Sequence, residues 1–243
     1  MKSHSWKRVL AVGCSHGIYA DPDAIAAVLR FKREFKPHTT IHLGDFCDCS
    51  AFMGSKLAAG DGDPIAPDLD GGLSFLRDLA PNFVLFGNHE DRLHRLAESR
   101  NELVAFCAAD VLKDISDTAE RLRAPIVPYT GNEQDLRIAD IRFMHGTVFG
   151  ENATRDHAES FTINGAKKVV HAHSHRAGMA SARRGDGSMA FNVGTLTARG
   201  ALDYAKTRRS TLSWSQGFVW GEYNTTTSQL FLCQKQGDFW RLP

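Results

Sequence analysis

Short apolar runs, each followed at once by polar or glycine residues, recur along the first half of the chain. The run Arg8 to Cys14 (RVLAVGC) predicts a parallel strand buried on both faces, because its apolar residues do not alternate with polar ones. Asp21-Pro22 then predicts a helix start, with Asp21 as N-cap and Pro22 in the first turn. Shorter strands are expected over Thr40 to Leu43 and Phe83 to Phe86. This alternation of strands and helices predicts an α/β fold.

The second half of the chain is richer in strand patterns. Helices are expected over His89 to Ser99 and Glu102 to Ala119, before a strand over Lys167 to His171. Three hairpins are expected, at 136–144, 179–193 and 218–234. Residues 54–72 are rich in Gly, Pro and Asp and predict a surface loop, a candidate lid. The pattern as a whole predicts two sheets with helices outside them.

Length and composition limit the classes of protein that this chain can represent. Its 243 residues fit a single domain over 1–243, with 200–243 as a β-rich extension of that domain. Hydrophobic residues make up 42% and charged residues 23%, which excludes a disordered or fibrous chain. The net charge of +1 gives no overall attraction to nucleic acid or to membranes. No apolar run approaches the ~20 residues that a membrane helix needs. Five cysteines without a CxxC pair or an export signal favour reduced thiols in the cytoplasm.

Polar residues cluster at the expected strand ends, where α/β folds place their ligands. The clusters are Cys14-Ser15-His16, Gly44-Asp45-Phe46-Cys47-Asp48, Gly87-Asn88-His89-Glu90, His145-Gly146 and His173-Ser174-His175. Residues two apart at a strand end point the same way, so Cys14 with His16, and His173 with His175, can each present two ligands. Oxygen and imidazole donors in this number suit a pair of divalent metals such as Mn, Fe, Zn or Co.

In this order, the clusters resemble the motifs of the calcineurin-like metallophosphoesterase superfamily: DxH, GDxxD, GNH(E/D), H and GHxH. The resemblance runs from Cys14 to His175. Within the superfamily, the chain resembles the bacterial and phage members. It implies a four-layer α-β-β-α sandwich of two mixed sheets flanked by helices, in agreement with the strand pattern. It also implies metal-dependent hydrolysis of a phosphate mono- or diester, with two divalent ions as cofactors.

The resemblance also implies a role for individual residues. The first metal would be held by His16 and His175, the second by Asn88, His145 and His173, and both by Asp45, with Cys14 beside the first. His89 would contact the scissile phosphate and protonate the leaving group as general acid. Asp48 would bond to His89, orient it and raise its pKa. Asn88 and His89 are thus substrate contacts, and Arg176, directly after His175, is a further candidate contact for phosphate.

The chemistry of such a site can also be argued from physical principles alone, without reference to the family. Two metals ~3.5–4 Å apart hold a bridging hydroxide and phosphate oxygens, and their charge lowers the pKa of the attacking water toward ~7. Cys14 departs from the family pattern, which has an aspartate there. A thiolate is a softer ligand and favours Zn or Fe over Mn or Mg. Cys49 stands where phosphoprotein phosphatases carry an arginine, which argues against that branch.

Two alternatives remain open at the level of sequence. A nuclease acting on DNA or RNA would use basic runs such as Arg183-Arg184 and 206–209 along a groove. A non-catalytic metal-binding module, with a degenerate first metal site at Cys14, would keep the fold without the reaction. The sequence leaves the natural substrate and the oligomeric state open.

Overall fold

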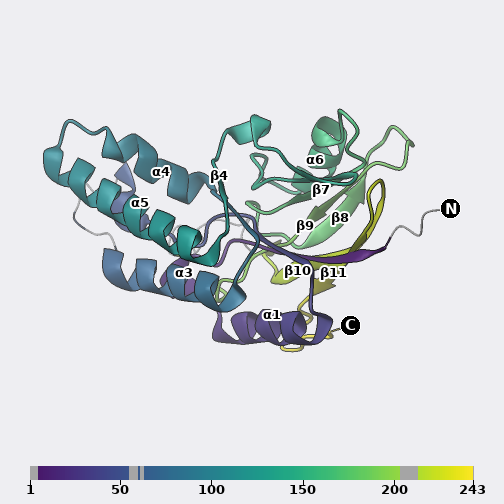
Figure 1. The fold of residues 1–243 in the computed structure, drawn as a ribbon, viewed down its shortest axis with the longest axis horizontal. Coiled ribbons are helices and arrows are strands. Elements are labelled where there is room, and N and C mark those ends of the chain that lie inside the picture. The colour runs from purple at the N-terminus through teal and green to yellow at the C-terminus, as the bar shows by residue number, and fades with distance from the viewer. Residues whose placement is uncertain (1–4, 55–59, 61–62, 203–212, 243) are drawn as a thin grey trace.

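Two β-sheets packed face to face form the centre of the molecule (Figure 1). The computed structural model describes residues 5–54, 60, 63–202 and 213–242. The helices are α1 (Pro22–Phe35), α3 (Ile65–Leu79), α4 (Asn88–Ala97), α5 (Glu102–Leu122) and α6 (Ala153–Phe161), with 3-10 turns at Gly17–Tyr19, Ser50–Phe52 and Gly131–Glu133. None of these helices is long and apolar enough to cross a membrane.

The strands form one six-stranded and one five-stranded sheet. The first has the order β11-β10-β1-β2-β3-β4, with β1 (Lys7–Val12), β2 (Thr39–His42), β3 (Phe83–Leu85), β4 (Ile126–Val127), β10 (Gly217–Tyr223) and β11 (Ser228–Gln234). The second has the order β5-β6-β7-β9-β8, with β5 (Leu136–Ile138), β6 (Ile141–Phe143), β7 (Lys168–His171), β8 (Gly178–Ser181) and β9 (Met189–Asn192). Both sheets are mixed, and the three hairpins expected from the sequence are confirmed.

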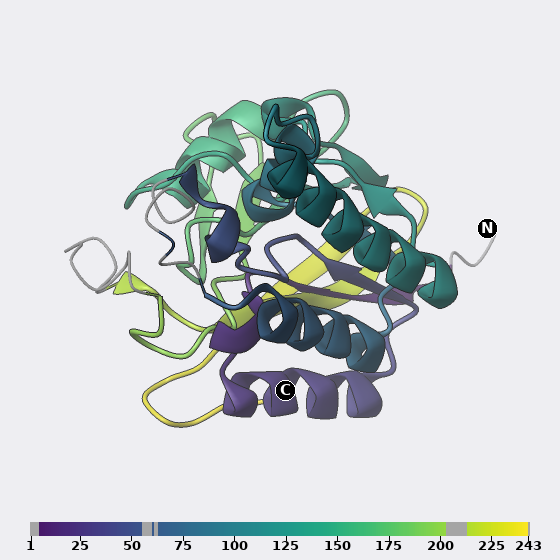
Figure 2. The ribbon, with the colours of Figure 1, turned by 90° about the vertical axis from the view of Figure 1, so that its left-hand side faces the viewer.

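Apolar clusters separate the layers. Between the sheets, Val9, Ile41 and Leu85 of the first sheet share a core with Phe143 and Val170 of the second. On the outer face of the first sheet, residues of β1 and β10 pack against α1. On the outer face of the second sheet, residues of β7 and β9 pack against α6. The end view shows α1 and α3 side by side beneath the strands (Figure 2). The four-layer α-β-β-α sandwich is therefore confirmed.

Parallel pairing sets where the polar clusters lie. β1 pairs in parallel with β2, and β2 with β3, so the carboxyl ends of these strands share one edge of the first sheet. β6, β7 and β9 are likewise parallel in the second sheet. The expected clusters follow β1, β2, β3, β6 and β7, and the fold collects them between the sheets at this edge.

The segment 54–72 corrects one expectation. Its last part is helical rather than a loop, because α3 begins at Ile65. The two glycines that suggested a loop allow close packing instead. A Cβ on Gly71 would lie 2.9 Å from the backbone of Gly17, and one on Gly72 would lie 2.7 Å from the carbonyl oxygen of Phe46. The candidate lid falls largely on 55–59 and 61–62, outside the described residues, and 203–212 of the C-terminal extension lies outside them too.

Candidate metal centre

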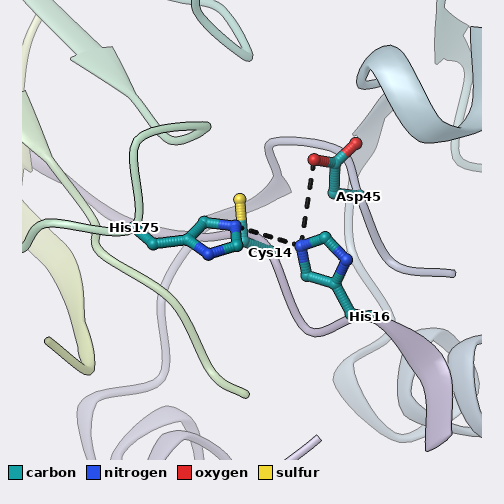
Figure 3. A group of neighbouring side chains, drawn as sticks. All are labelled: Cys14, His16, Asp45 and His175. Carbon is teal, nitrogen blue, oxygen red and sulfur yellow. Dashed lines mark hydrogen bonds and ion pairs between the residues drawn. The ribbon is translucent and has the colours of Figure 1, made fainter. Parts of the chain in front are cut away.

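A first group of donors lies where β1, β2 and β7 end (Figure 3). Its members are Cys14, His16, Asp45 and His175, whose ligand atoms all lie within 4.8 Å of one another. All four side chains are buried. In Figure 3 the sulfur, the two imidazoles and the carboxylate converge on one point from three different loops. These are the residues that the family resemblance implied for the first metal, with Cys14 beside them.

A second group lies beside the first and shares Asp45 with it. Asp45, His145 and His173 present ligand atoms within 4.8 Å of one another. Asn88 Oδ1 joins them, 3.2 Å from His145 Nε2 and 2.9 Å from His173 Nδ1. The seven expected ligands therefore form two adjacent donor sets with one carboxylate in common.

In the first set, two imidazole nitrogens face one another. His16 Nδ1–H donates to Asp48 Oδ1 at 2.8 Å, which leaves His16 Nε2 as an acceptor. That nitrogen lies 3.1 Å from His175 Nε2 (Figure 3). His175 Nδ1 is buried and has no hydrogen-bond partner among the described residues. One proton carried by either ring makes this distance a hydrogen bond, and a divalent cation can take the place of that proton.

The second set has the same character. His145 Nδ1–H donates to the carbonyl oxygen of Leu43 at 2.8 Å, so its Nε2 is an acceptor when the ring is neutral. This Nε2 lies 3.1 Å from Asp45 Oδ2 and 3.2 Å from Asn88 Oδ1. Partners behind metal-binding histidines commonly fix the tautomer in this way. The donor chemistry of both sets therefore fits divalent metal ions.

The backbone is strained at five of the seven candidate ligands. Cys14, His16, Asp45, His173 and His175 have φ between 54° and 67°, the left-handed region that residues with a Cβ seldom adopt. Each such residue costs about 1–3 kcal/mol and persists only where the surroundings hold it. Their concentration here indicates that the loops are shaped for the site rather than for stability.

The ionisation states of Asp45, His173 and His175 suit metal binding, whereas Asp48 and Asp45 outweigh burial and raise the pKa of His16 and His145, which a bound cation would have to deprotonate. Burial raises the pKa of Asp45, but the nearby His145 and His89 outweigh it and hold this pKa well below its usual range. Burial and the charge of His145 lower the pKa of His173 to about 3, and burial lowers that of His175. A carboxylate and neutral imidazoles are the forms that ligate metals. Burial and the charge of Asp45 raise the pKa of Cys14, so its thiol needs a cation to lose its proton.

The expected pairing of Asp48 with His89 is corrected. The Asp48 carboxylate is held by His16 at 2.8 Å and lies 3.4 Å from His89 Nδ1. His89 Nδ1–H donates instead to the backbone carbonyl of Asp48 at 2.5 Å. Burial outweighs the charge of Asp45 and lowers the pKa of His89, where a raised value was expected. Asp48 therefore orients His89 through its main chain and His16 through its carboxylate.

Glu90 organises the centre, a role that the sequence did not indicate although the residue lies in the GNHE motif. Its carboxylate is fully buried and accepts three backbone N–H bonds. Gly87 and Asp45 donate to Oε2 at 2.9 Å each, and Cys47 donates to Oε1 at 3.1 Å. Burial, reinforced by the charge of Asp45, raises the pKa of Glu90 to about 7. Glu90 thereby ties the loop after β2 to the start of α4.

We expect Glu90→Gln to destabilise the protein by about 1–3 kcal/mol, because an amide NH₂ would face at least one backbone N–H that now has an acceptor. Urea unfolding at pH 8 measures this change. Glu120→Gln, at an exposed position of α5, is the matched control and should shift stability by less than about 0.5 kcal/mol. Equal stability of the two variants would contradict the role given to Glu90.

Gln134 is a second residue that sequence reasoning missed. It is buried, and its Oε1 accepts the backbone N–H of His145 at 2.6 Å. Its Nε2 donates to the carbonyl oxygens of Phe86 at 2.9 Å and Pro128 at 3.0 Å. Gln134 therefore joins the strand end that carries His145 to the one that carries Asn88. No motif or spacing marks this residue in the sequence.

The basic residues considered as substrate contacts do not belong to the two donor sets. Arg176 is half-buried and its backbone bridges to Ser215; its contact with phosphate stays a prediction. Arg184 donates to Thr162 Oγ1 at 2.5 Å and pairs with Glu159 at 3.4 Å and Asp186 at 3.5 Å. This engagement reduces the charge that the run Arg183-Arg184 offers to a nucleic acid. The second basic run, 206–209, lies outside the described residues.

The family model for calcineurin-like phosphoesterases matches residues 7–177, which include both donor sets. The chain belongs to the calcineurin-like phosphoesterase family. Members of this family are metal-dependent hydrolases of phosphate esters, and the histidine and aspartate groups described above provide places for the divalent metals. No curated protein matches the chain at a significant level.

Several solved structures resemble this calcineurin-like phosphoesterase. PH1004 from Pyrococcus horikoshii OT3 is 13% identical, with a TM-score of 0.52 over 95% of this chain and 88% of that chain. A metallophosphoesterase from Sphaerobacter thermophilus is 13% identical, with a TM-score of 0.48 over 94% and 88% of the two chains. Yfce, a phosphoesterase from E. coli, is 16% identical, with a TM-score of 0.42 over 94% and 98%. At such identities the match to PH1004 supports the fold alone.

Proposed function

We propose that this phosphoesterase hydrolyses a phosphate mono- or diester with two divalent metals, one in each donor set, and with His89 as general acid. The observation that carries the proposal is the position of Asp45, which is shared by two groups of side chains whose ligand atoms lie within 4.8 Å of one another. Bound there, two divalent cations supply Lewis acidity and lower the pKa of a water to about 7. The first site takes Cys14, His16, Asp45 and His175, and the second takes Asp45, Asn88, His145 and His173.

The hydrogen bonding of His89 supports its proposed role as proton donor. Its Nδ1–H is held by the carbonyl oxygen of Asp48, so Nε2 is the nitrogen that turns toward the site, 3.9 Å from Asp45 Oδ2. Burial lowers the pKa of His89, but an arriving phosphate brings negative charge beside the ring and favours its protonated form. His89 can then give this proton to the departing oxygen. Asn88, the preceding residue, and Arg176 complete the proposed contacts with substrate.

The experiment that tests this function is hydrolysis of p-nitrophenyl phosphate and bis(p-nitrophenyl) phosphate by protein loaded with Mn²⁺, Zn²⁺ or Fe²⁺. We expect turnover that a chelator abolishes, and the ratio of the two rates assigns monoester or diester preference. Folded protein that binds two metals and hydrolyses neither ester would contradict the proposal and favour the non-catalytic module. Cleavage of single-stranded DNA in preference to both esters would favour the nuclease alternative.

Cys14 is expected to act as a thiolate ligand of the first metal. Protein loaded with Co²⁺ should show a thiolate-to-metal charge-transfer band in the near ultraviolet, and Cys14→Asp should remove it. The same variant should shift relative affinity from Zn²⁺ toward Mn²⁺, because a carboxylate is a harder ligand than a thiolate. Cys107→Ser, at a partly exposed position of α5, is the control and should leave the band intact. A band that persists in Cys14→Asp would exclude Cys14 as the ligand.

A further inference from the structure

Aromatic rings border the proposed metal centre, each against a different candidate ligand. The ring of Tyr129 lies 5.8 Å from that of His145, centroid to centroid, and the ring of Trp214 lies 4.3 Å from that of His175. The ring of Phe149 lies 6.4 Å from that of His173. All three contacts are edge-to-face. The proposed phosphate site is therefore bordered by apolar faces as well as by metal ligands.

Phe149 differs from the other two rings in its exposure. Tyr129 and Trp214 are partly buried, whereas Phe149 is 80% exposed. A single exposed phenylalanine is ordinary on a protein surface, and Phe106 on α5 is another, 70% exposed. The position of Phe149 is what distinguishes it, because its ring touches a candidate ligand while most of its surface remains open to a bound molecule.

The local backbone explains how Phe149 reaches this position. It lies in the loop that follows His145 and precedes α6. Gly146 and Gly150 flank the segment, with φ of +103° and +106°, values that residues with side chains rarely adopt. A Cβ at Gly146 would also lie 3.0 Å from His157 Nε2. The turn at Gly146 keeps the segment close to the second donor set, and it carries Phe149 back over His173.

We propose that Phe149 is a platform for a flat aromatic group of the substrate, so that the preferred substrates are phosphate esters whose organic part carries an aromatic ring. The phosphate would lie at the metal ligands and the ring of the ester would lie on Phe149. Stacking of aromatic rings adds to the burial of their apolar surface, whereas a saturated ring gives burial alone. This inference rests on the proposed function, because it uses the same phosphate site.

The test compares two ligands that differ only in aromaticity. Benzylphosphonate and cyclohexylmethylphosphonate have the same size and charge, and their C–P bonds resist hydrolysis. Titration calorimetry with Zn²⁺-loaded protein measures their dissociation constants. We expect benzylphosphonate to bind about three- to tenfold more tightly, the range that aromatic stacking provides. Phe149→Ala should reduce this ratio to near one, and Phe149→Trp should retain it.

Phe106→Ala is the matched control, since it removes an exposed phenylalanine of similar exposure from α5, and it should leave the ratio unchanged. Equal binding of the two phosphonates by the wild type, binding of neither, or an unchanged ratio in Phe149→Ala would overturn the platform. Hydrolysis of benzyl phosphate, assayed separately, tests the proposed function. Tighter binding of benzylphosphonate without hydrolysis by any metal form would support the role of Phe149 and contradict the proposed phosphoesterase activity. The failure of one proposal can therefore be told from the failure of the other.

Discussion

Asp45→Asn is expected to weaken metal binding at both sites by more than about a hundredfold, because even residues behind the ligands cost 10- to 100-fold when changed. Asparagine has the size of aspartate, but it lacks the charge and the second acceptor oxygen that a bridging ligand needs. Asp45 Oδ1 also accepts the backbone N–H of His89 at 3.1 Å, and an amide oxygen can keep this bond. The fold should therefore survive while both metals are lost together.

Metal content after dialysis, measured by mass spectrometry, together with the hydrolysis rate, checks this result. Asp70→Asn, at an exposed position of α3, is the control and should retain metal and activity. A variant that loses one metal and keeps the other would show that Asp45 is not shared. Full metal content in Asp45→Asn would contradict the whole arrangement.

His89→Ala is expected to lower kcat by about a hundred- to ten-thousandfold, the contribution of general acid catalysis. The metal content should remain that of the wild type, because the proposal does not make His89 a ligand. The pH profile should change as well. A general acid must be protonated, so the rate of the wild type falls as pH rises through the pKa of His89, and this limb should be absent from the variant.

The control for this substitution is His94→Ala, an exposed histidine on the same helix, which should leave kcat within about twofold, as expected for a surface change. A second control uses an ester with a leaving group of low pKa, which needs little proton donation. The loss in His89→Ala should be smaller for that ester. An equal loss for all esters would indicate that His89 positions the phosphate without donating a proton.

The sequence predicted the strands and their polar ends well, for a physical reason. A strand buried on both faces is a continuous apolar run, and the residue at which the run stops marks the strand end. β1, β2, β3 and β7 could be located in this way to within a few residues. Six of the seven candidate ligands follow those ends and His145 follows β6; the family resemblance singled them out, and the structure brings all of them together.

Helices that depend on small residues were harder to predict. α6 was not expected, because its buried face consists of Ala153, Ala158, His157 and Phe161, and alanines give a weak hydrophobic period. The start of α3 was read as a loop, since Gly71 and Gly72 resemble a turn until the backbones packed against them are known. What identifies the start of this helix is the backbone packed against it, which comes from other segments of the same chain and not from its own sequence.

The connections behind the ligands could not be predicted from sequence at all. Nothing in a single sequence indicates that Asp48 bonds to His16 rather than to His89, because the two imidazoles lie within reach of the same carboxylate. The backbone groups to which Gln134 and Glu90 bond likewise depend on which N–H groups the fold leaves without other partners.

The pairing of β1 with β10 limits the order in which the protein can fold while it is being synthesised. Lys7 of β1 lies opposite Tyr223 of β10, and the carbonyl oxygen of Cys14 accepts bonds from Leu196 N–H at 3.0 Å and Thr195 Oγ1 at 2.8 Å. On the ribosome, the first strand emerges long before these partners are synthesised, so one of its edges stays unpaired for most of translation. Cys14 can reach its final position only after residues well beyond His175 have left the exit tunnel. A nascent chain that already contains every candidate ligand therefore still lacks the two bonds that hold the carbonyl oxygen of Cys14.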